Sequence, residues 1–199
     1  GSTEVAWAIN RALAAKSGPV VPLIAETGGI NAMVVDATAL PEQVTDDVIA
    51  SAFRSAGQRC SALRVLYLQE DVADRMIEMI AGAAAELKLG DPADPSTDIG
   101  PIIDAEARAS LQSHIAAMRK AATTHFVGQV PAGALAGGYF FPPHIIELRD
   151  ARQLDREVFG PVLHVVRWRA AELDQVLDSI AATGYGLTLG IHTRIDETA

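Results

Sequence analysis

Arg64-Val65-Leu66-Tyr67-Leu68-Gln69 decides the fold of this chain, together with the helical pattern over residues 72–87 that follows it. The first stretch is rich in apolar, β-branched and aromatic residues, which predicts a strand. Asp71 is expected to cap the following helix, whose apolar residues are expected to pack on the core: Met76, Ile77, Met79 and Ile80. A strand followed at once by a helix is the repeating unit of an α/β fold.

The same alternation extends in both directions along the chain. We expect further strands over residues 20–25, 31–36, 162–168 and 187–193, and an extended segment over residues 139–148. We expect further helices over residues 3–16, 41–57, 104–122 and 171–183, and a Gly-rich turn over residues 128–138. These elements predict an α/β three-layer sandwich with a mostly parallel sheet.

Composition limits the class of protein. The chain has 199 residues, of which 49% are apolar, so it can bury the core of one domain. Its net charge of −9 argues against a nucleic-acid surface, because phosphate binding depends on Lys and Arg. A single cysteine cannot form an internal disulfide and no apolar run reaches membrane-spanning length, so we expect a cytoplasmic protein.

The single cysteine, Cys60, stands among small and polar residues in Gly57-Gln58-Arg59-Cys60-Ser61. A thiolate can attack an electrophilic carbon, and a positioned carboxylate can then activate water. Glu26 is the candidate carboxylate, because it follows the apolar run of residues 20–25 and would lie at the carboxyl end of a strand, where open α/β sheets bind ligands. The alternative for Cys60 is a core position, since free cysteine behaves as a small hydrophobe.

Four motifs occur in order along the chain: Ala25-Glu26-Thr27-Gly28-Gly29, Gly57-Gln58-Arg59-Cys60, Gly90-Asp91-Pro92 with Asp98-Ile99-Gly100-Pro101, and Glu157-Val158-Phe159-Gly160-Pro161. This order resembles the signature of the aldehyde dehydrogenase superfamily. Ser61 and the phrases at residues 31–36 and 184–194 resemble, more narrowly, the L-glutamate-γ-semialdehyde dehydrogenase module of bacterial bifunctional proline utilization A proteins. The chain covers less than half of such a module.

The resemblance implies a role for each site residue. Cys60 would be the nucleophile, Glu26 the base that activates the hydrolytic water, and Ser61 a contact to the substrate carboxylate. The backbone N–H of Cys60 could stabilise the tetrahedral oxyanion. NAD is the implied cofactor, and the residues implied to bind it are Ser2, Gly28, Glu157 and Phe159.

The resemblance also implies how the chain is organised. Residues 1–25 would form the end of the cofactor-binding domain, and residues 26–199 the catalytic domain, incomplete at its C-terminus. The expected partners are a small aldehyde substrate, the rest of the dehydrogenase, a proline dehydrogenase domain in the same chain, and further copies in a homo-oligomer. We expect no metal site, because the five histidines show no ligand spacing and Cys60 has no partner cysteine.

Two other classes of function stay open at this point. The chain could be a non-catalytic fragment or interaction module that keeps the fold and the site residues without turnover. It could also be a cysteine hydrolase acting on esters or thioesters, which needs no cofactor but requires a histidine near Cys60. The sequence does not identify such a histidine.

Overall fold

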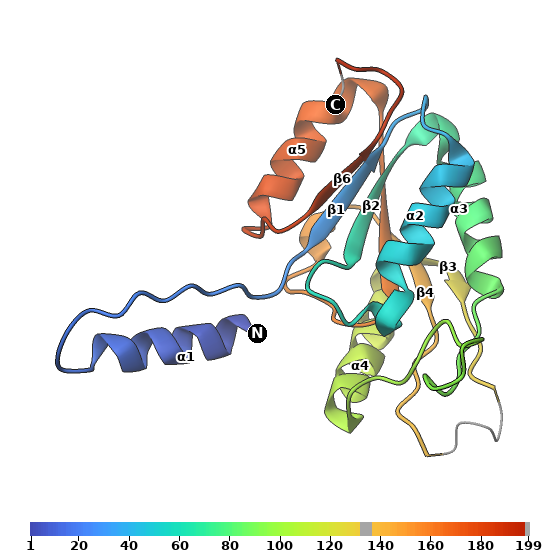
Figure 1. Ribbon diagram of the computed structural model, residues 1–199. Helices are drawn as coiled ribbons and strands as arrows, with labels where there is room; N and C mark the ends of the chain where they lie inside the picture. The colour runs from blue at the N-terminus through green and yellow to red at the C-terminus, as the bar shows by residue number, and fades with distance from the viewer. Residues whose placement is uncertain (132–136, 198–199) are drawn as a thin grey trace.

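Figure 1 shows the computed structural model of the chain, which describes residues 1–131 and 137–197. These described residues form six strands and five α-helices in this order: α1 Thr3–Ala14, β1 Asn31–Val35, α2 Pro41–Ala52, β2 Leu63–Gln69, α3 Glu70–Ala85, α4 Ala105–Ala121, β3 Thr123–Val127, β4 His144–Leu148, β5 Val162–Trp168, α5 Leu173–Ala182 and β6 Leu189–His192. Short 3₁₀ turns lie at Arg54–Gly57, Ala151–Gln153 and Ala170–Glu172.

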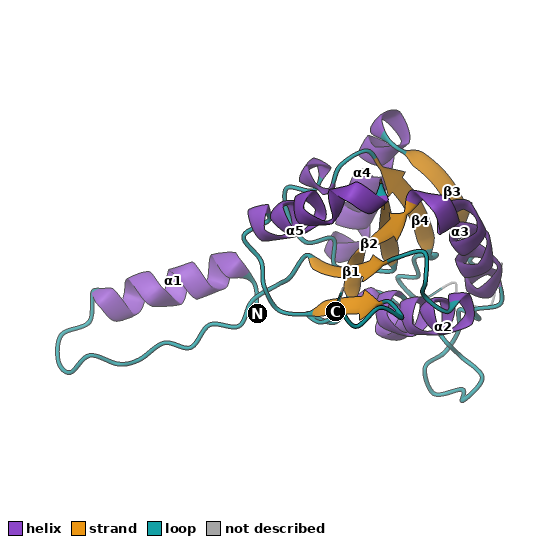
Figure 2. Ribbon diagram, turned by 90° about the horizontal axis from the view of Figure 1, so that it is seen from above, coloured by secondary structure: helices purple, strands orange, loops and turns teal. Residues whose placement is uncertain are grey.

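The strands form one sheet in the order β3-β4-β5-β2-β1-β6. Every neighbouring pair is parallel except β3 with β4, which is antiparallel. Helices α2 and α3 cover one face of the sheet, whereas α4 and α5 cover the other (Figure 2). The predicted three-layer α/β sandwich with a mostly parallel sheet is therefore confirmed.

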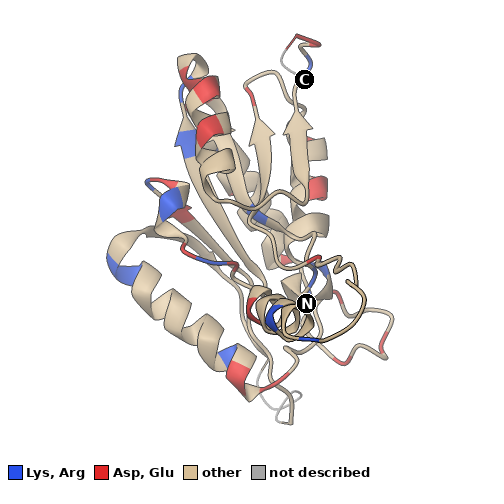
Figure 3. Cartoon of the chain, turned by 90° about the vertical axis from the view of Figure 1, so that its left-hand side faces the viewer, with Lys and Arg blue, Asp and Glu red and all other residues tan. Residues whose placement is uncertain are grey.

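Burial follows the position of each strand in the sheet. All five residues of β1 are buried, as are six of the seven in β2, which is typical of strands covered by helices on both faces. The edge strands differ, since β3 is mainly exposed and β6 leaves Leu189 and Ile191 partly open to solvent. Charged side chains lie mostly on helices and loops, and the strands carry few (Figure 3).

The sequence also predicts Ser2 or Thr3 as the N-cap of the first helix, and Ser2 takes that position; the helix expected from residue 104 begins at Ala105, with Asp104 as its N-cap. The Ser2 hydroxyl accepts a hydrogen bond from the Val5 N–H at the start of α1, and the Asp104 carboxylate accepts one from the Ala107 N–H at the start of α4. The prediction that Asp71 caps α3 is wrong. The cap position belongs to Gln69, whose amide donates to the Asp71 carboxylate instead, because β2 runs into α3 with no loop between them.

The strand predicted over residues 20–25 is also wrong. This segment is extended but pairs with no strand in the described part of the chain, and it is exposed throughout. Val20 is 97% exposed and Ile24 88% exposed. An apolar run forms a strand only where a neighbouring strand satisfies its backbone, and here none is within reach.

Helix α1 and the extended segment after it lie apart from the sandwich (Figures 1 and 2). No residue of α1 is buried, and the helix exposes Val5, Trp7 and Ile9. Two hydrogen bonds tie its start to the entry of β1: the Gly1 nitrogen donates to the Glu26 carbonyl, and the Thr3 hydroxyl donates to the Thr27 hydroxyl. A boundary between residues 25 and 26 stays a prediction.

The Gly-rich turn predicted over residues 128–138 falls partly outside the described residues, which omit 132–136. The strands beside it are antiparallel neighbours, β3 and β4.

Among the helices of the described residues, none has the length and apolar character needed to cross a membrane.

Candidate active site

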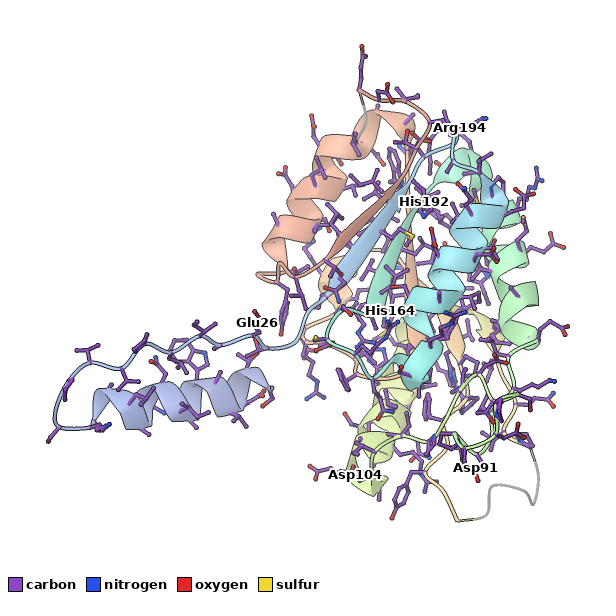
Figure 4. The ribbon with its side chains drawn as sticks, in the orientation of Figure 1. Glu26, Asp91, Asp104, His164, His192 and Arg194 are labelled. Atoms are coloured by element: carbon purple, nitrogen blue, oxygen red, sulfur yellow. The ribbon has the colours of Figure 1, made fainter. Side chains whose placement is uncertain are left out.

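The candidate site lies at the amino-terminal edge of the parallel strands, not at the carboxyl edge expected from the sequence. Residues 26–30 lead into β1, residues 57–62 into β2, residues 157–161 into β5 and residues 185–188 into β6. Figure 4 shows Glu26 at this end of the sheet, with His192 and Arg194 at the other. The expectation fails because residues 20–25 form no strand, so Glu26 precedes the start of β1.

The loop that carries Cys60 begins with an unusual backbone. After α2, Ser55, Ala56 and Gly57 have φ of 56°, 52° and 65°, which is the left-handed region. Glycine adopts this region without steric cost, whereas Ser55 and Ala56 are strained in it. A Cβ added at Gly57 would lie 2.1 Å from the Gly160 carbonyl oxygen. The nucleophile loop and the loop before β5 therefore touch backbone to backbone.

Polar side chains of neighbouring segments fix the loop that carries Cys60 by hydrogen bonds. The buried Asn31 amide donates to the carbonyls of Cys60 and Ala62 at 2.7 and 2.8 Å. The Arg59 guanidinium donates to two carbonyls at the end of α2, those of Ala50 and Ser51, at 2.9 and 3.0 Å. These bonds orient the loop carbonyls inward and fix the main chain around the thiol.

Cys60 itself is exposed, so the alternative of a core cysteine is wrong. Within the described part of the chain, no hydrogen-bond acceptor lies on its backbone N–H and no histidine bonds to its thiol. The free N–H is available to an oxyanion formed beside the sulfur. The missing histidine does not favour a cysteine hydrolase.

A cavity of about 520 Å³ opens next to Cys60. It brings together five of the residues predicted from the sequence: Ser2, Gly28, Cys60, Glu157 and Phe159. The remaining walls come from the start of α1, from Arg156 and from Tyr185. The cofactor-binding roles of these residues stay predictions, but the fold gathers them around one space beside the only thiol.

The structure does not bring the side chains of Glu26 and Ser61 into this lining. Both residues are exposed, and neither is among those that line the cavity. The main chain of Glu26 lies next to the start of α1, since its carbonyl accepts from the Gly1 nitrogen at 3.1 Å. The roles predicted for the Glu26 carboxylate and the Ser61 hydroxyl stay predictions.

Glu157 is held on one side of the cavity by a buried arginine. The Arg64 guanidinium, which is fully buried, donates to Glu157 Oε1 from Nε at 3.3 Å and from Nη2 at 2.9 Å. The Gly29 N–H donates to the other oxygen, Oε2, at 3.2 Å. Burial lowers the pKa of Arg64, and its bonds to Glu157 oppose that shift. A Cβ at Gly28 would lie 2.0 Å from Oε2, so only glycine leaves room for the carboxylate there.

These residues fit a dinucleotide such as NAD. The cavity includes the first residues of the twelve-residue helix α1, and a helix N-terminus suits a phosphate group. The Glu157 carboxylate can accept from ribose hydroxyls, and Phe159, 44% exposed, offers an aromatic surface. Among the described residues no group of three or more metal-ligating side chains is found.

Arg64 and Asn31 were not predicted as site residues from the sequence. A signal for both was present, because each is a polar residue in or at the start of a run that is otherwise apolar and buried. Buried polar side chains of this kind have partners, and in a central strand those partners come from other segments. The sequence could not name them.

A buried histidine pair lies behind Arg64. His164 Nδ1 lies 3.0 Å from the Arg64 carbonyl, so it carries the proton and donates. His164 Nε2 therefore accepts from His114 Nε2 at 2.9 Å. Burial, and after it the neighbouring His114, lowers the pKa of His164 to about 3. Both rings are neutral in the folded chain at ordinary pH.

This pair should make the chain less stable in mild acid. The pKa of His164 is lower in the folded than in the unfolded chain, so the unfolded chain binds more protons below its own pKa of about 6.5. We expect His164 to lower the free energy of unfolding by about 2 kcal/mol between pH 7 and pH 5. Chemical denaturation of wild type and His164→Gln at both pH values measures this. Equal pH dependence in the two proteins would contradict it.

Comparison with known proteins agrees with this geometry. The chain is 55% identical over 205 residues to the bifunctional protein PutA of Klebsiella aerogenes, covering all of this chain and 16% of that protein. A crystal structure of bifunctional proline utilization A matches with a TM-score of 0.94 and 67% identity, over 100% of this chain and 20% of that one. A 1-pyrroline-5-carboxylate dehydrogenase from Thermus with bound NAD matches with a TM-score of 0.84 and 31% identity, over 100% of this chain and 38% of that one. The aldehyde dehydrogenase family model matches residues 1–199, and the chain belongs to that family.

Proposed function

We propose that this chain is the catalytic part of a larger enzyme that oxidises L-glutamate γ-semialdehyde to L-glutamate with NAD⁺. One observation carries the proposal: Cys60, exposed on a loop with a fixed main chain, opens onto the same cavity as Gly28, Glu157 and Phe159. The substrate is suggested by similarity to proteins whose names refer to proline utilization and to 1-pyrroline-5-carboxylate.

The chemistry at Cys60 follows from the loop around it. The thiolate adds to the aldehyde carbon, and the oxygen of the tetrahedral adduct takes a hydrogen bond from the Cys60 N–H. Glu157, Phe159 and the start of α1 would hold NAD⁺ beside Cys60, and the bound cofactor would supply the acceptor for the hydride that leaves this carbon. The resulting thioester is then hydrolysed, which releases the carboxylic acid and restores the thiol.

Glu26 is proposed as the base for the hydrolysis step. Its exposed position at the entry to β1 leaves its carboxylate accessible to water. In the complete enzyme we expect Glu26→Gln to give a rapid burst of NADH followed by turnover at least about 100-fold slower, because hydride transfer precedes the step that needs the base. Stopped-flow absorbance of NADH measures both phases.

A matched control for Glu26→Gln is Glu42→Gln, which neutralises an exposed carboxylate in the first turn of α2, beyond the carboxyl end of β1. It should show wild-type kinetics. Loss of the burst itself in Glu26→Gln would move Glu26 to an earlier step, such as activation of the thiol.

The function as a whole is tested on the complete protein. We expect NADH formation with glutamate semialdehyde, and a larger KM for this substrate when Ser61 is changed to alanine, because Ser61 is proposed to contact its carboxylate. An aldehyde of similar size without a carboxylate serves as the comparison, and its KM should not change. Absence of NADH formation with any aldehyde would overturn the proposal.

The partners of the chain belong to the same proposal. The chain spans 16% of the length of the PutA relative, so the rest of the dehydrogenase and a proline dehydrogenase domain would be supplied by the same polypeptide. We propose a homo-oligomeric enzyme in the cytoplasm, where a single free thiol such as Cys60 stays reduced.

A further inference from the structure

We propose that Arg64 is a positioning residue for the cofactor, because one buried guanidinium holds the Glu157 carboxylate, the Phe159 ring and the main chain next to Cys60 in a single arrangement. The inference rests on the proposed function, in which Glu157 and Phe159 bind NAD⁺.

The guanidinium uses four hydrogen bonds to link two loops. Nε and Nη2 donate to Glu157 Oε1, and Nη1 donates to the Gly160 carbonyl at 3.2 Å. Nη2 also donates to the Arg59 carbonyl at 3.0 Å, one residue before the nucleophile. The planar guanidinium directs these four bonds at fixed angles, so it fixes the position of Glu157 Oε1 relative to both loops, which a freely rotating ammonium does not do.

The two oxygens of Glu157 are thereby given different tasks. Of the two oxygens, Arg64 donates only to Oε1. Oε2 lies beside Gly28 and, within the described part of the chain, accepts only from the Gly29 N–H. A carboxylate oxygen can accept two hydrogen bonds, so Oε2 keeps capacity for a donor hydroxyl. Gly28 and Glu157 both line the cavity, so that hydroxyl would come from a ligand in it.

The same guanidinium also contacts the aromatic wall of the cavity. Its central carbon lies 5.3 Å from the centre of the Phe159 ring, within the range of a cation–π contact. Phe159 is partly exposed and lines the cavity, so Arg64 supports it from the protein side. Arg64 is itself fixed by β2, where its carbonyl accepts from His164.

The rival explanation is that Arg64 only neutralises a buried carboxylate. The two explanations differ in what they predict for cofactor affinity. A positioning role requires that loss of Arg64 weakens NAD⁺ binding through Glu157, so the effects of changing the two residues should not add. A merely structural role would lower stability without a specific loss of NAD⁺.

The test uses the complete protein and titration calorimetry with NAD⁺, without substrate. We expect Arg64→Gln and Glu157→Gln each to weaken NAD⁺ binding about tenfold, and the double variant to bind no more weakly than Glu157→Gln alone. The KM for the aldehyde should change less than about twofold. Arg167→Gln is the matched control, since it removes an arginine of β5 that pairs with Glu147 of β4 and Asp74 of α3, and it should leave NAD⁺ affinity unchanged.

A second variant covers the case in which Arg64→Gln does not fold, which circular dichroism would reveal. Arg64→Lys keeps the charge but loses the planar guanidinium, so it should also weaken NAD⁺ binding.

Two results would overturn the inference. One is wild-type NAD⁺ affinity in Arg64→Lys, and the other is wild-type NAD⁺ affinity in Arg64→Gln when Glu157→Gln binds NAD⁺ more weakly. Wild-type affinity in Glu157→Gln would instead overturn the cofactor role of Glu157 in the proposed function, and this inference with it.

Discussion

Cys60→Ala is expected to abolish aldehyde oxidation by the complete enzyme, with a loss of at least about 10⁴-fold in kcat. Cys60 is the only thiol in the chain, so no other cysteine of this chain can form the covalent adduct. The fold should be unchanged, because the side chain is exposed and the loop is held through its main chain by Asn31. NADH formation under saturating substrate measures the loss.

Binding of NAD⁺ separates this effect from misfolding. Cys60→Ala should bind NAD⁺ as tightly as wild type in calorimetry, since the proposed cofactor contacts come from Glu157, Phe159 and the start of α1. Cys60→Ser is a closer replacement and should also be inactive, because a hydroxyl without an activating base is a far weaker nucleophile than a thiolate. Near-normal turnover by the alanine variant would remove Cys60 from the mechanism.

Gly57→Ala is expected to be the most damaging change outside the reacting groups. Gly57 has φ of 65°, and a Cβ would lie 2.1 Å from the Gly160 oxygen and 2.4 Å from the Gly160 carbonyl carbon. Both contacts are to backbone, so no side chain can move aside. We expect a loss of about 3 to 5 kcal/mol in the free energy of unfolding, and a loss of activity because the two site loops are pushed apart.

Gly82→Ala is a control that is expected to raise the free energy of unfolding, whereas Gly57→Ala is expected to lower it. Gly82 lies inside α3, where an added Cβ meets no atom within 4 Å. Alanine has the higher helix propensity, so this variant should be more stable by about 0.5 to 1 kcal/mol. Thermal unfolding of both variants beside wild type makes the comparison. A Gly57→Ala protein as stable as wild type would show that the two loops need not approach this closely.

Composition and local residue patterns were enough to predict the architecture of the sandwich. The composition of the segments at β1, β2 and β5 predicted strands, and their alternation with helices predicted a three-layer sandwich. The start of the first helix at Ser2 or Thr3 followed from local capping chemistry, which depends on residues three or four positions apart. The motif order also predicted the family, and the resemblance named five of the residues that line the cavity.

Only the tertiary structure decided where the site lies and what holds it. Which edge of the sheet carries the site depends on which segments become strands. Residues 20–25 have the composition of a strand but no neighbouring strand to pair with. Arg64 and Glu157 are 93 positions apart in the sequence, and Gly57 and Gly160, whose backbones touch, are also far apart in the sequence. Contacts of this range are created when β2 and β5 pair, and no local pattern of residues contains them.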